Sequence, residues 1–274
     1  MLSNLSFAQM AIVISLSIIP SFILLFLILY SDRKNREPVP LIIISVISGL
    51  FTISLSLLID KIFLKLNISN DILLSYNNYN IFKIIILASV EEFSKWFVLY
   101  IFLSHNSSYD DIYDGFVYSS IISLSFALTE TIMYVFSETA FQDMTNLAIL
   151  RNITSVPLHI VCGIIMGYNI SLVKFSKYKK NKIFKLSKSL LIPIFVHSLY
   201  NLFFSILSFR NVNNYISVVI MVLFIMGIYV LGCLYILETV VLNKIFMNNL
   251  IYDKDYDYLM TRQEFLMRRS NKWD

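Results

Sequence analysis

The chain has 274 residues, of which 57% are hydrophobic and 15% are charged, and its formal net charge is +4. Soluble domains carry about 25% charged residues, so this composition excludes a soluble globular domain and predicts an all-α, polytopic membrane helix bundle. The two cysteines, Cys162 and Cys233, both lie in apolar segments. We interpret them as small buried hydrophobic residues, not as a disulfide framework or a thiolate metal cluster.

Apolar runs long enough to cross a bilayer recur through the chain and predict about seven transmembrane helices. The first run has no basic segment before it, so we expect a retained span and not a cleaved signal peptide. We assign residues 1–248 to the bundle and residues 249–274 to a polar cytosolic tail. The expected spans lie at residues 10–30, 38–60, 81–104, 115–136, 150–173, 189–208 and 215–243.

The distribution of lysine and arginine sets the expected orientation. Basic residues gather after the first span, in the segment 174–188 after the fifth span, and in the tail, and seven spans place all three groups on one side. Cytoplasmic loops carry such an excess, so we predict the N-terminus outside and the C-terminus inside, with an acidic outer loop at 137–149. The basic segment could also indicate a nucleic-acid patch, but membrane topology and contact with anionic lipid explain it better beside two spans. We therefore expect the lipid bilayer as a partner and no nucleic acid.

Three ionisable residues, Glu91, Glu92 and Lys95, interrupt the third span. Each costs about 3 kcal/mol near a membrane centre, or roughly 9 kcal/mol together, whereas the apolar residues around them return about 6 kcal/mol. This helix must therefore face a protein interior or a water-filled cavity, and intramembrane charges of this kind mark functional sites. The alternative is a structural ion pair of the glutamates with Lys95, but buried pairs gain little net stability.

Polar residues also interrupt the next three spans: Glu130 in the fourth, His159 in the fifth, and His197 with Asn201 in the sixth. The four-residue spacing places His197 and Asn201 on one face of a helix, one turn apart. His159 belongs to a stripe that ends in a Gly-x-x-x-Gly pair, which permits close approach of a neighbouring backbone. We therefore expect His159 to face the bundle core. The stripe consists of Arg151, Ser155, His159, Gly163 and Gly167.

The depths of these residues agree with one another. At about 1.5 Å of rise per residue, Glu91 lies roughly 15 Å, His159 roughly 13 Å, His197 roughly 16 Å and Glu130 roughly 9 Å from the outer membrane edge. Four polar sites on four helices thus fall in one layer, which predicts a single cavity opening to the extracellular side. For Glu130, simple packing against Arg151 near the outer surface is an equal alternative.

These groups suit the activation of water. A partly desolvated carboxylate can act as a general base, while histidine and asparagine can stabilise an oxyanion. Two histidines and a glutamate can instead hold a divalent ion, and this donor set suits zinc. The HExxH motif, in which two histidines one turn apart bind zinc, is absent. The Gly-x-Ser-x-Gly and Gly-x-Gly-Asp motifs are absent as well, so serine and aspartyl mechanisms lack support. A proton- or ion-coupled transporter that uses Glu91, Lys95 and Glu130 as a relay is the main alternative, although no internal repeat favours it.

Four short motifs in this order resemble the PrsW family of intramembrane proteases, which is related to the CAAX prenyl proteases. They are Glu91-Glu92-x-x-Lys95, Phe126-x-x-x-Glu130, His159 and His197-x-x-x-Asn201, within about residues 85–205. The resemblance implies that Glu91 and Glu92 act as general base and that His159 and His197 are metal ligands or oxyanion donors, with Glu91 as a third ligand. It also implies supporting roles for Lys95, Glu130 and Asn201. The family pattern has asparagine where Thr131 follows Glu130.

The same resemblance implies a substrate and a location. Such proteases make the first cut in a single-span anti-sigma factor, near the outer face of the bacterial plasma membrane, as part of a stress response. A cavity that opens outward, as expected from depth and charge, suits that cut. A catalytically inert relative that binds a partner helix through the same groove is a third possibility.

Overall fold

The computed structural model describes residues 5–33, 35–65, 81–105, 108–176, 182–209 and 215–247, with short pieces at 263–264 and 266–267. Within these residues the regular structure is helical and contains no β-strand, so the predicted all-α class is confirmed. The helices are α1 (Phe7–Ser31), α2 (Val39–Lys65), α4 (Ile81–His105), α5 (Ile112–Val135), α6 (Phe141–Ile153), α7 (Ser155–Lys174), α8 (Lys182–Phe209) and α9 (Tyr215–Met247).

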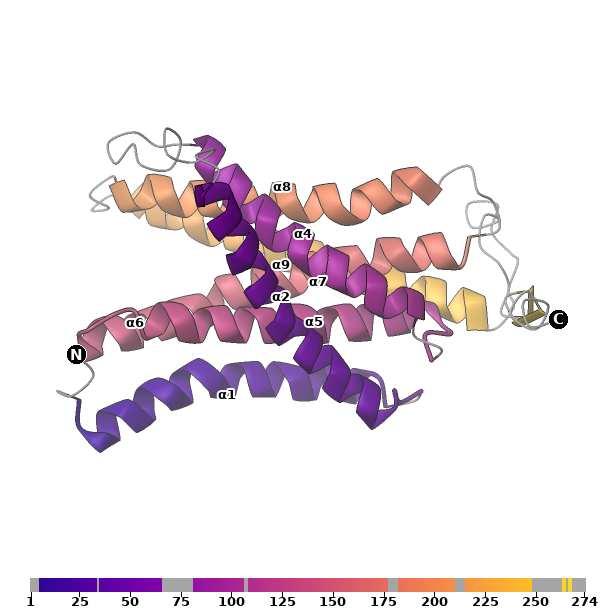
Figure 1. Ribbon diagram of the computed structural model, residues 1–274, viewed down its shortest axis with the longest axis horizontal. Coiled ribbons are helices and arrows are strands. Elements are labelled where there is room, and N and C mark those ends of the chain that lie inside the picture. Colours follow the sequence, from indigo (N-terminus) through magenta and orange to yellow (C-terminus); the bar gives the residue numbers. More distant parts are fainter. Residues whose placement is uncertain are drawn as a thin grey trace.

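Six stretches of the described chain are long and apolar enough to cross a membrane, namely α1, α2, α5, α6 with α7, α8 and α9. Helix α4 is of similar length but carries the predicted charges, and it packs against α2, α5, α7 and α8. These stretches and α4 run alternately between two ends of the bundle (Figure 1). We call the end where α1, α4 and α9 begin the N-terminal end. The opposite end is the basic end, where Arg33, Arg36, Lys174 and Lys182 lie.

The acidic outer loop expected at 137–149 is wrong, because α6 begins at Phe141 and leads almost directly into α7. The joint between the two helices has a local cause. Pro157 has no backbone N–H, so the carbonyl four residues earlier, that of Ile153, loses its helical donor. The hydroxyl of Tyr229 on α9 donates to that carbonyl instead, at 2.7 Å. The fifth span is therefore a longer, kinked helix held by α9.

Two further expectations need correction. Helix α8 begins at Lys182 instead of residue 189, so part of the basic segment 174–188 is helical. Cys233 is exposed on α9, whereas Cys162 is buried as expected. Residues 177–181 and nearly all of the tail lie outside the described residues, so the prediction for the tail stays untested.

The core of the bundle is the contact between α5 and α7, and small residues make it possible. A methyl group added at Gly163 would lie 2.8 Å from the backbone oxygen of Ser119, and one added at Gly167 would overlap the backbone oxygen of Gly115. The close approach predicted from the Gly-x-x-x-Gly pair is confirmed. Helix α2 crosses α5 just as tightly at Gly49, where an added methyl would overlap the backbone oxygen of Ile122, and it then runs obliquely toward α4 (Figure 1).

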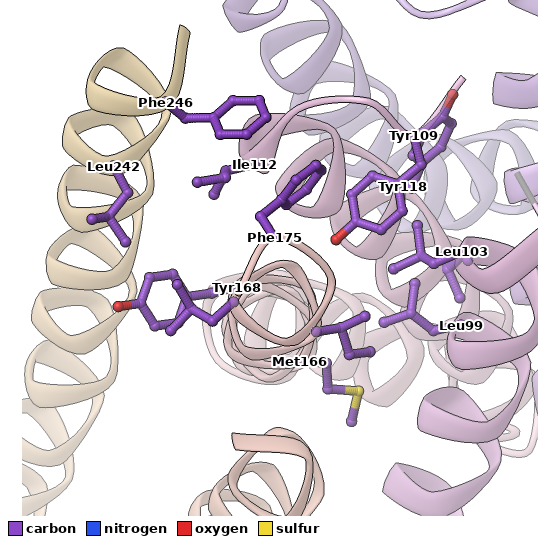
Figure 2. Close-up of a cluster of buried hydrophobic side chains, with 13 residues drawn as sticks. Leu99, Leu103, Tyr109, Ile112, Tyr118, Met166, Tyr168, Phe175, Leu242 and Phe246 are labelled. Carbon is purple, nitrogen blue, oxygen red and sulfur yellow. The ribbon is translucent and has the colours of Figure 1, made fainter. Parts of the chain in front are cut away.

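Aromatic and aliphatic side chains fill the bundle toward the basic end. Figure 2 shows this cluster, in which the ring of Phe175 packs edge-on to Tyr109 and also contacts Phe246 of α9. Burial of such side chains contributes about 1.5–3 kcal/mol each. The cluster packs the ends of α4, α7 and α9 against the start of α5, so buried apolar side chains fill this end of the bundle next to the polar layer.

Buried acidic side chains connect the segment between α1 and α2 to the start of α5 at the basic end. Asp111 caps α5, and Asp114 accepts a hydrogen bond from the backbone of Asp111 in return. Tyr118 donates to Glu37, which precedes α2. Burial raises the pKa of the Asp32 carboxyl to about 7, and the neighbouring carboxylates act in the same direction, while a backbone hydrogen bond from Glu37 opposes them. These contacts fix the first turn of α2 to α5.

Candidate active site

Glu92 and Lys95 form the centre of the polar layer and are both fully buried. The Nζ of Lys95 lies 2.5 Å from Oε1 of Glu92, and the same oxygen accepts from Nδ1 of His197 at 2.7 Å. Lys95 also donates to Nδ1 of His159, at 2.9 Å. Charge-assisted hydrogen bonds of this kind are roughly twice as strong as neutral ones. Helices α4, α7 and α8 are therefore joined through one ammonium and one carboxylate.

Glu130 extends this network to α5 and α6. Its Oε2 lies 2.8 Å from Nε2 of His159 and 2.6 Å from a guanidinium nitrogen of Arg151. The Nε of Arg151 donates to the hydroxyl of Thr131 at 3.2 Å, the position where the family pattern has asparagine. Glu130 is thus both the packing partner of Arg151, which was one alternative, and a neighbour of the histidine.

The hydrogen-bond partners assign the tautomer of each histidine. An ammonium has no acceptor, so the Nδ1 of His159 accepts from Lys95 and its Nε2–H donates to Glu130. For His197 the carboxylate of Glu92 accepts from Nδ1–H, so the lone pair is on Nε2. That Nε2 lies 3.9 Å from Oε2 of Glu91. His197 therefore turns an available nitrogen toward the remaining glutamate.

Glu91 and Glu92 are adjacent in sequence but lie in different surroundings. The structure pairs Lys95 with Glu92, three residues away, although the four-residue spacing would also allow a pair with Glu91. The Glu92 side chain is 0% exposed and that of Glu91 17% exposed. Oε2 of each glutamate has no hydrogen-bond partner among the described residues, but Oε1 of Glu92 accepts from Lys95 and His197. Glu92 is consequently held by its neighbours, while the carboxylate of Glu91 is partly exposed.

Glu91 and Glu130 line a cavity of about 280 Å³ between α2, α4 and α5. Its lining extends toward the N-terminal end of the bundle as far as Asp60 near the end of α2 and Ser137 just after α5. The ring of Phe126 forms part of the wall and also packs edge-on to His159, with ring centres 5.2 Å apart. The polar layer expected from depth thus borders a cavity, and its opening to the extracellular side stays a prediction.

The structure brings together Glu91, Glu92, Lys95, Glu130, His159 and His197, all of which the sequence singled out. Asn201, one turn after His197 on α8, is half-buried and is not part of the hydrogen-bond network among the described residues. Its supporting role stays a prediction. Sequence reasoning missed Ser56 and Asp60, which line the cavity from α2. The signal for Asp60 was a carboxylate at the very end of an apolar span.

The residues present fit a divalent metal ion. One donor atom each of Glu91, His159 and His197 lies within 4.8 Å of the other two, which is close enough for a single ion. His197 and Glu91 have available donors, and a histidine whose other nitrogen donates to a carboxylate is the usual arrangement at zinc sites. His159 differs, because both of its nitrogens have partners, and binding requires it to release Lys95 or Glu130.

Comparison with known proteins agrees with this arrangement. The family model described as PrsW family intramembrane metalloprotease matches residues 37–246, well over half of the chain. The chain belongs to the PrsW family. Protease PrsW of Oceanobacillus iheyensis is 31% identical over 218 residues, which are 79% of this chain and 93% of that protein. Protease PrsW of Clostridioides difficile is 31% identical over 68% of this chain and 76% of its own length.

A third relative in the PrsW family, Protease PrsW of Bacillus subtilis, is 29% identical over 72% of this chain and 84% of its own length. No solved structure matches the chain. The family and its bacterial members, together with the apolar helices, establish that this chain is an intramembrane protease and a multi-pass bacterial membrane protein. The resemblance drawn from the four motifs is confirmed.

Proposed function

We propose that the chain cuts a single-span regulatory protein, such as an anti-sigma factor, close to the outer membrane face. The cavity that Glu91 lines extends toward the N-terminal end of the bundle, and the basic residues Arg33, Arg36 and Lys174 lie at the other end. Positive residues favour the cytoplasmic side, so this proposal places the cavity mouth outside. The anti-sigma-factor class follows from the family resemblance.

The contrast between Glu91 and Glu92 is the observation that carries the mechanism. Glu91 lines the cavity and its side chain is 17% exposed, whereas Glu92 is 0% exposed and does not line it, so Glu91 acts as the general base that takes a proton from the attacking water. After the attack, the same carboxyl gives that proton to the leaving amine. Glu92 is fully enclosed by Lys95 and His197 and orients them.

The two histidines act beside Glu91. The Nε2 of His197 turns toward the cavity carboxylate, and His159 is held in position by Lys95 and Glu130. A divalent ion, for which zinc is our proposal, would be held by His159, His197 and one carboxylate oxygen of Glu91, whose other oxygen would remain the base. When bound, such an ion polarises the scissile carbonyl and lowers the pKa of water. Lys95, with its positive charge beside the histidines, supports negative charge that develops in the transition state.

The test compares purified wild type with the Glu91→Gln and Glu138→Gln variants in liposomes that contain a single-span substrate. Glu138 lies just beyond α5 and outside the cavity, so its substitution is the matched control. We expect Glu91→Gln to remain folded and to lose about a hundredfold or more in cleavage rate, since general base catalysis contributes about 10²–10⁴-fold. Cleavage within tenfold of wild type in Glu91→Gln would remove Glu91 as the base.

The same liposomes test the transporter alternative. A relay through Glu91, Lys95 and Glu130 predicts a proton or solute flux that depends on these residues and requires no peptide product. We expect no such flux, because the hydrogen bonds link helices within one layer near Glu92 instead of running from one end of α4 to the other. Flux lost in Glu91→Gln would favour the relay.

A further inference from the structure

One face of α2 forms a wall of the active-site cavity. Ile53, Ser56, Leu57 and Asp60 all line it, and their spacing of three and four residues places them on one side of a helix. Gly49, one turn before Ile53, belongs to the same side and touches the backbone of α5. The helices are therefore in contact at Gly49, and they leave a hollow beyond it because their axes diverge.

The hollow is acidic and has no cation of its own. Asp60, Glu91 and Glu130 contribute three carboxylates to its lining, and no lysine or arginine of the described chain lines it. Glu130 already binds Arg151 and His159. Asp60 is half-buried and forms no ion pair or hydrogen bond with any described residue. The carboxylate of Asp60 is therefore available to bind a positively charged group of the substrate.

The walls around Asp60 suit a long side chain with a charged tip. Ile53, Leu57 and Met133 offer apolar surface, while Ser56 adds a hydroxyl one turn before Asp60. Lysine and arginine bury an aliphatic stem on such surface and keep the charged head at a polar group. A volume of about 280 Å³ corresponds to roughly nine water molecules. That space admits an extended piece of chain with one such side chain, but not an intact helix.

We propose that Asp60 and Ser56 form a specificity pocket for a lysine or arginine side chain of the substrate, close to the scissile bond. This inference rests on the proposed function, because it assumes that Glu91 marks the position of cleavage. It assigns to the outer half of α2 the choice of where a single-span protein is cut. A basic residue just outside the membrane segment of the substrate would meet Asp60 as the chain unwinds toward Glu91.

The test uses synthetic single-span peptides with one lysine placed in turn at each of six positions outside the membrane segment. Peptides with glutamine at the same positions are the reference. Binding is measured in nanodiscs with the Glu91→Gln protein at 0.15 M salt, where distant charges are screened, and cleavage is measured with wild type. We expect lysine at one or two positions to bind about tenfold more tightly than glutamine, which equals 1.4 kcal/mol.

Substitutions on α2 and a matched control decide the cause of any preference. Asp60→Asn should lower the lysine-to-glutamine ratio to below twofold, and Asp60→Lys should reverse it in favour of a peptide with glutamate. Asp143→Asn is the same chemical change at an exposed site on α6 and should leave the ratio unchanged. Equal ratios in wild type and Asp60→Asn, or a preference that is the same at all six positions, would overturn the pocket.

Binding and cleavage separate this inference from the proposed function. Cleavage without any lysine preference would retain the protease mechanism and refute the pocket. Lysine-dependent binding that Asp60→Asn removes, with no cleavage of any peptide by wild type, would support the pocket and refute the proposed substrate. If the peptides show neither cleavage nor a position-dependent preference, both proposals fail.

Discussion

Replacing Lys95 by methionine tests how the polar layer is held together. Lys95 is fully buried, with Nζ 2.5 Å from the carboxylate of Glu92 and 2.9 Å from Nδ1 of His159. Methionine fills a similar volume but removes the charge, so Glu92 would stay buried with His197 as its remaining donor. Breaking one side of a buried ion pair costs about 3–5 kcal/mol. Against a typical stability of about 5–15 kcal/mol, this loss is large.

The measurement is unfolding by sodium dodecyl sulfate in mixed micelles, for Lys95→Met, Glu92→Gln and the double variant. Each single change leaves the other partner buried without its counter-charge, whereas the double variant leaves no charge unpaired. We therefore expect the double variant to be more stable than the sum of the single losses predicts, by about 3 kcal/mol, as a double-mutant cycle measures. The double variant should also be inactive. A Lys95→Met loss below 1 kcal/mol, or additive losses, would refute the idea that this pair holds the site.

Three further predictions concern other parts of the molecule. Gly167→Ala should destabilise the bundle by about 1–3 kcal/mol through overpacking against α5, whereas Gly227→Ala, with nothing within 4 Å of the added methyl, should not; equal effects on detergent unfolding would contradict the packing argument. Chelation should abolish cleavage and zinc should restore it, and metal analysis should find the bound ion lost in His197→Ala; full activity after verified metal removal would exclude a metal role. Because burial raises the pKa of Asp32 from its ordinary 3.8 to about 7, the folded chain retains a proton that the unfolded chain loses between those values, so this group stabilises the fold at low pH and its contribution disappears as pH rises through 7. Stability measured at pH 5 and pH 8 should fall more steeply in wild type than in Asp32→Asn, and parallel slopes would show that the carboxyl does not titrate in this range.

Much of the site could be predicted from the sequence because charge is expensive inside a membrane. Glu91, Glu92 and Lys95 could not face lipid, and counting the rise per residue placed Glu130, His159 and His197 at the same depth. The structure joins these residues by hydrogen bonds, apart from Glu91, whose Oε2 lies 3.9 Å from Nε2 of His197. The apolar spans and the contact at Gly163 and Gly167 followed from hydropathy and from small-residue spacing in the same way.

The division of roles between the two glutamates could not be predicted. Residues three and four apart on a helix are both neighbours, so the spacing allows Lys95 to pair with either Glu91 or Glu92. The choice depends on His159 and His197, which come from other helices and reach Lys95 and Glu92 respectively. Asp60 was missed for a related reason, since its cavity depends on the angle at which α2 crosses α5.

The loop expected at 137–149 is wrong because a helix occupies most of this polar stretch between two apolar runs. Asp143 lies in the first turn of α6, and negative charge is favourable at the N-terminus of a helix. A carboxylate at that position therefore stabilises a helix instead of interrupting it. An acidic residue therefore distinguishes a loop from a helix only when its position relative to the end of the helix is known.

The contact of Gly49 with the backbone of α5 gives α2 a fulcrum near its middle. About 10 residues separate Gly49 from Val39 and about 11 separate it from Asp60, so the two arms measure roughly 15 Å and 16 Å. If α2 tilts as a rigid rod, every ångström gained at the cavity mouth demands a nearly equal and opposite displacement beside Glu37. Since Glu37 is bound to Tyr118 of α5, widening the entrance must either bend α2 above Gly49 or break that hydrogen bond on the far side of the membrane.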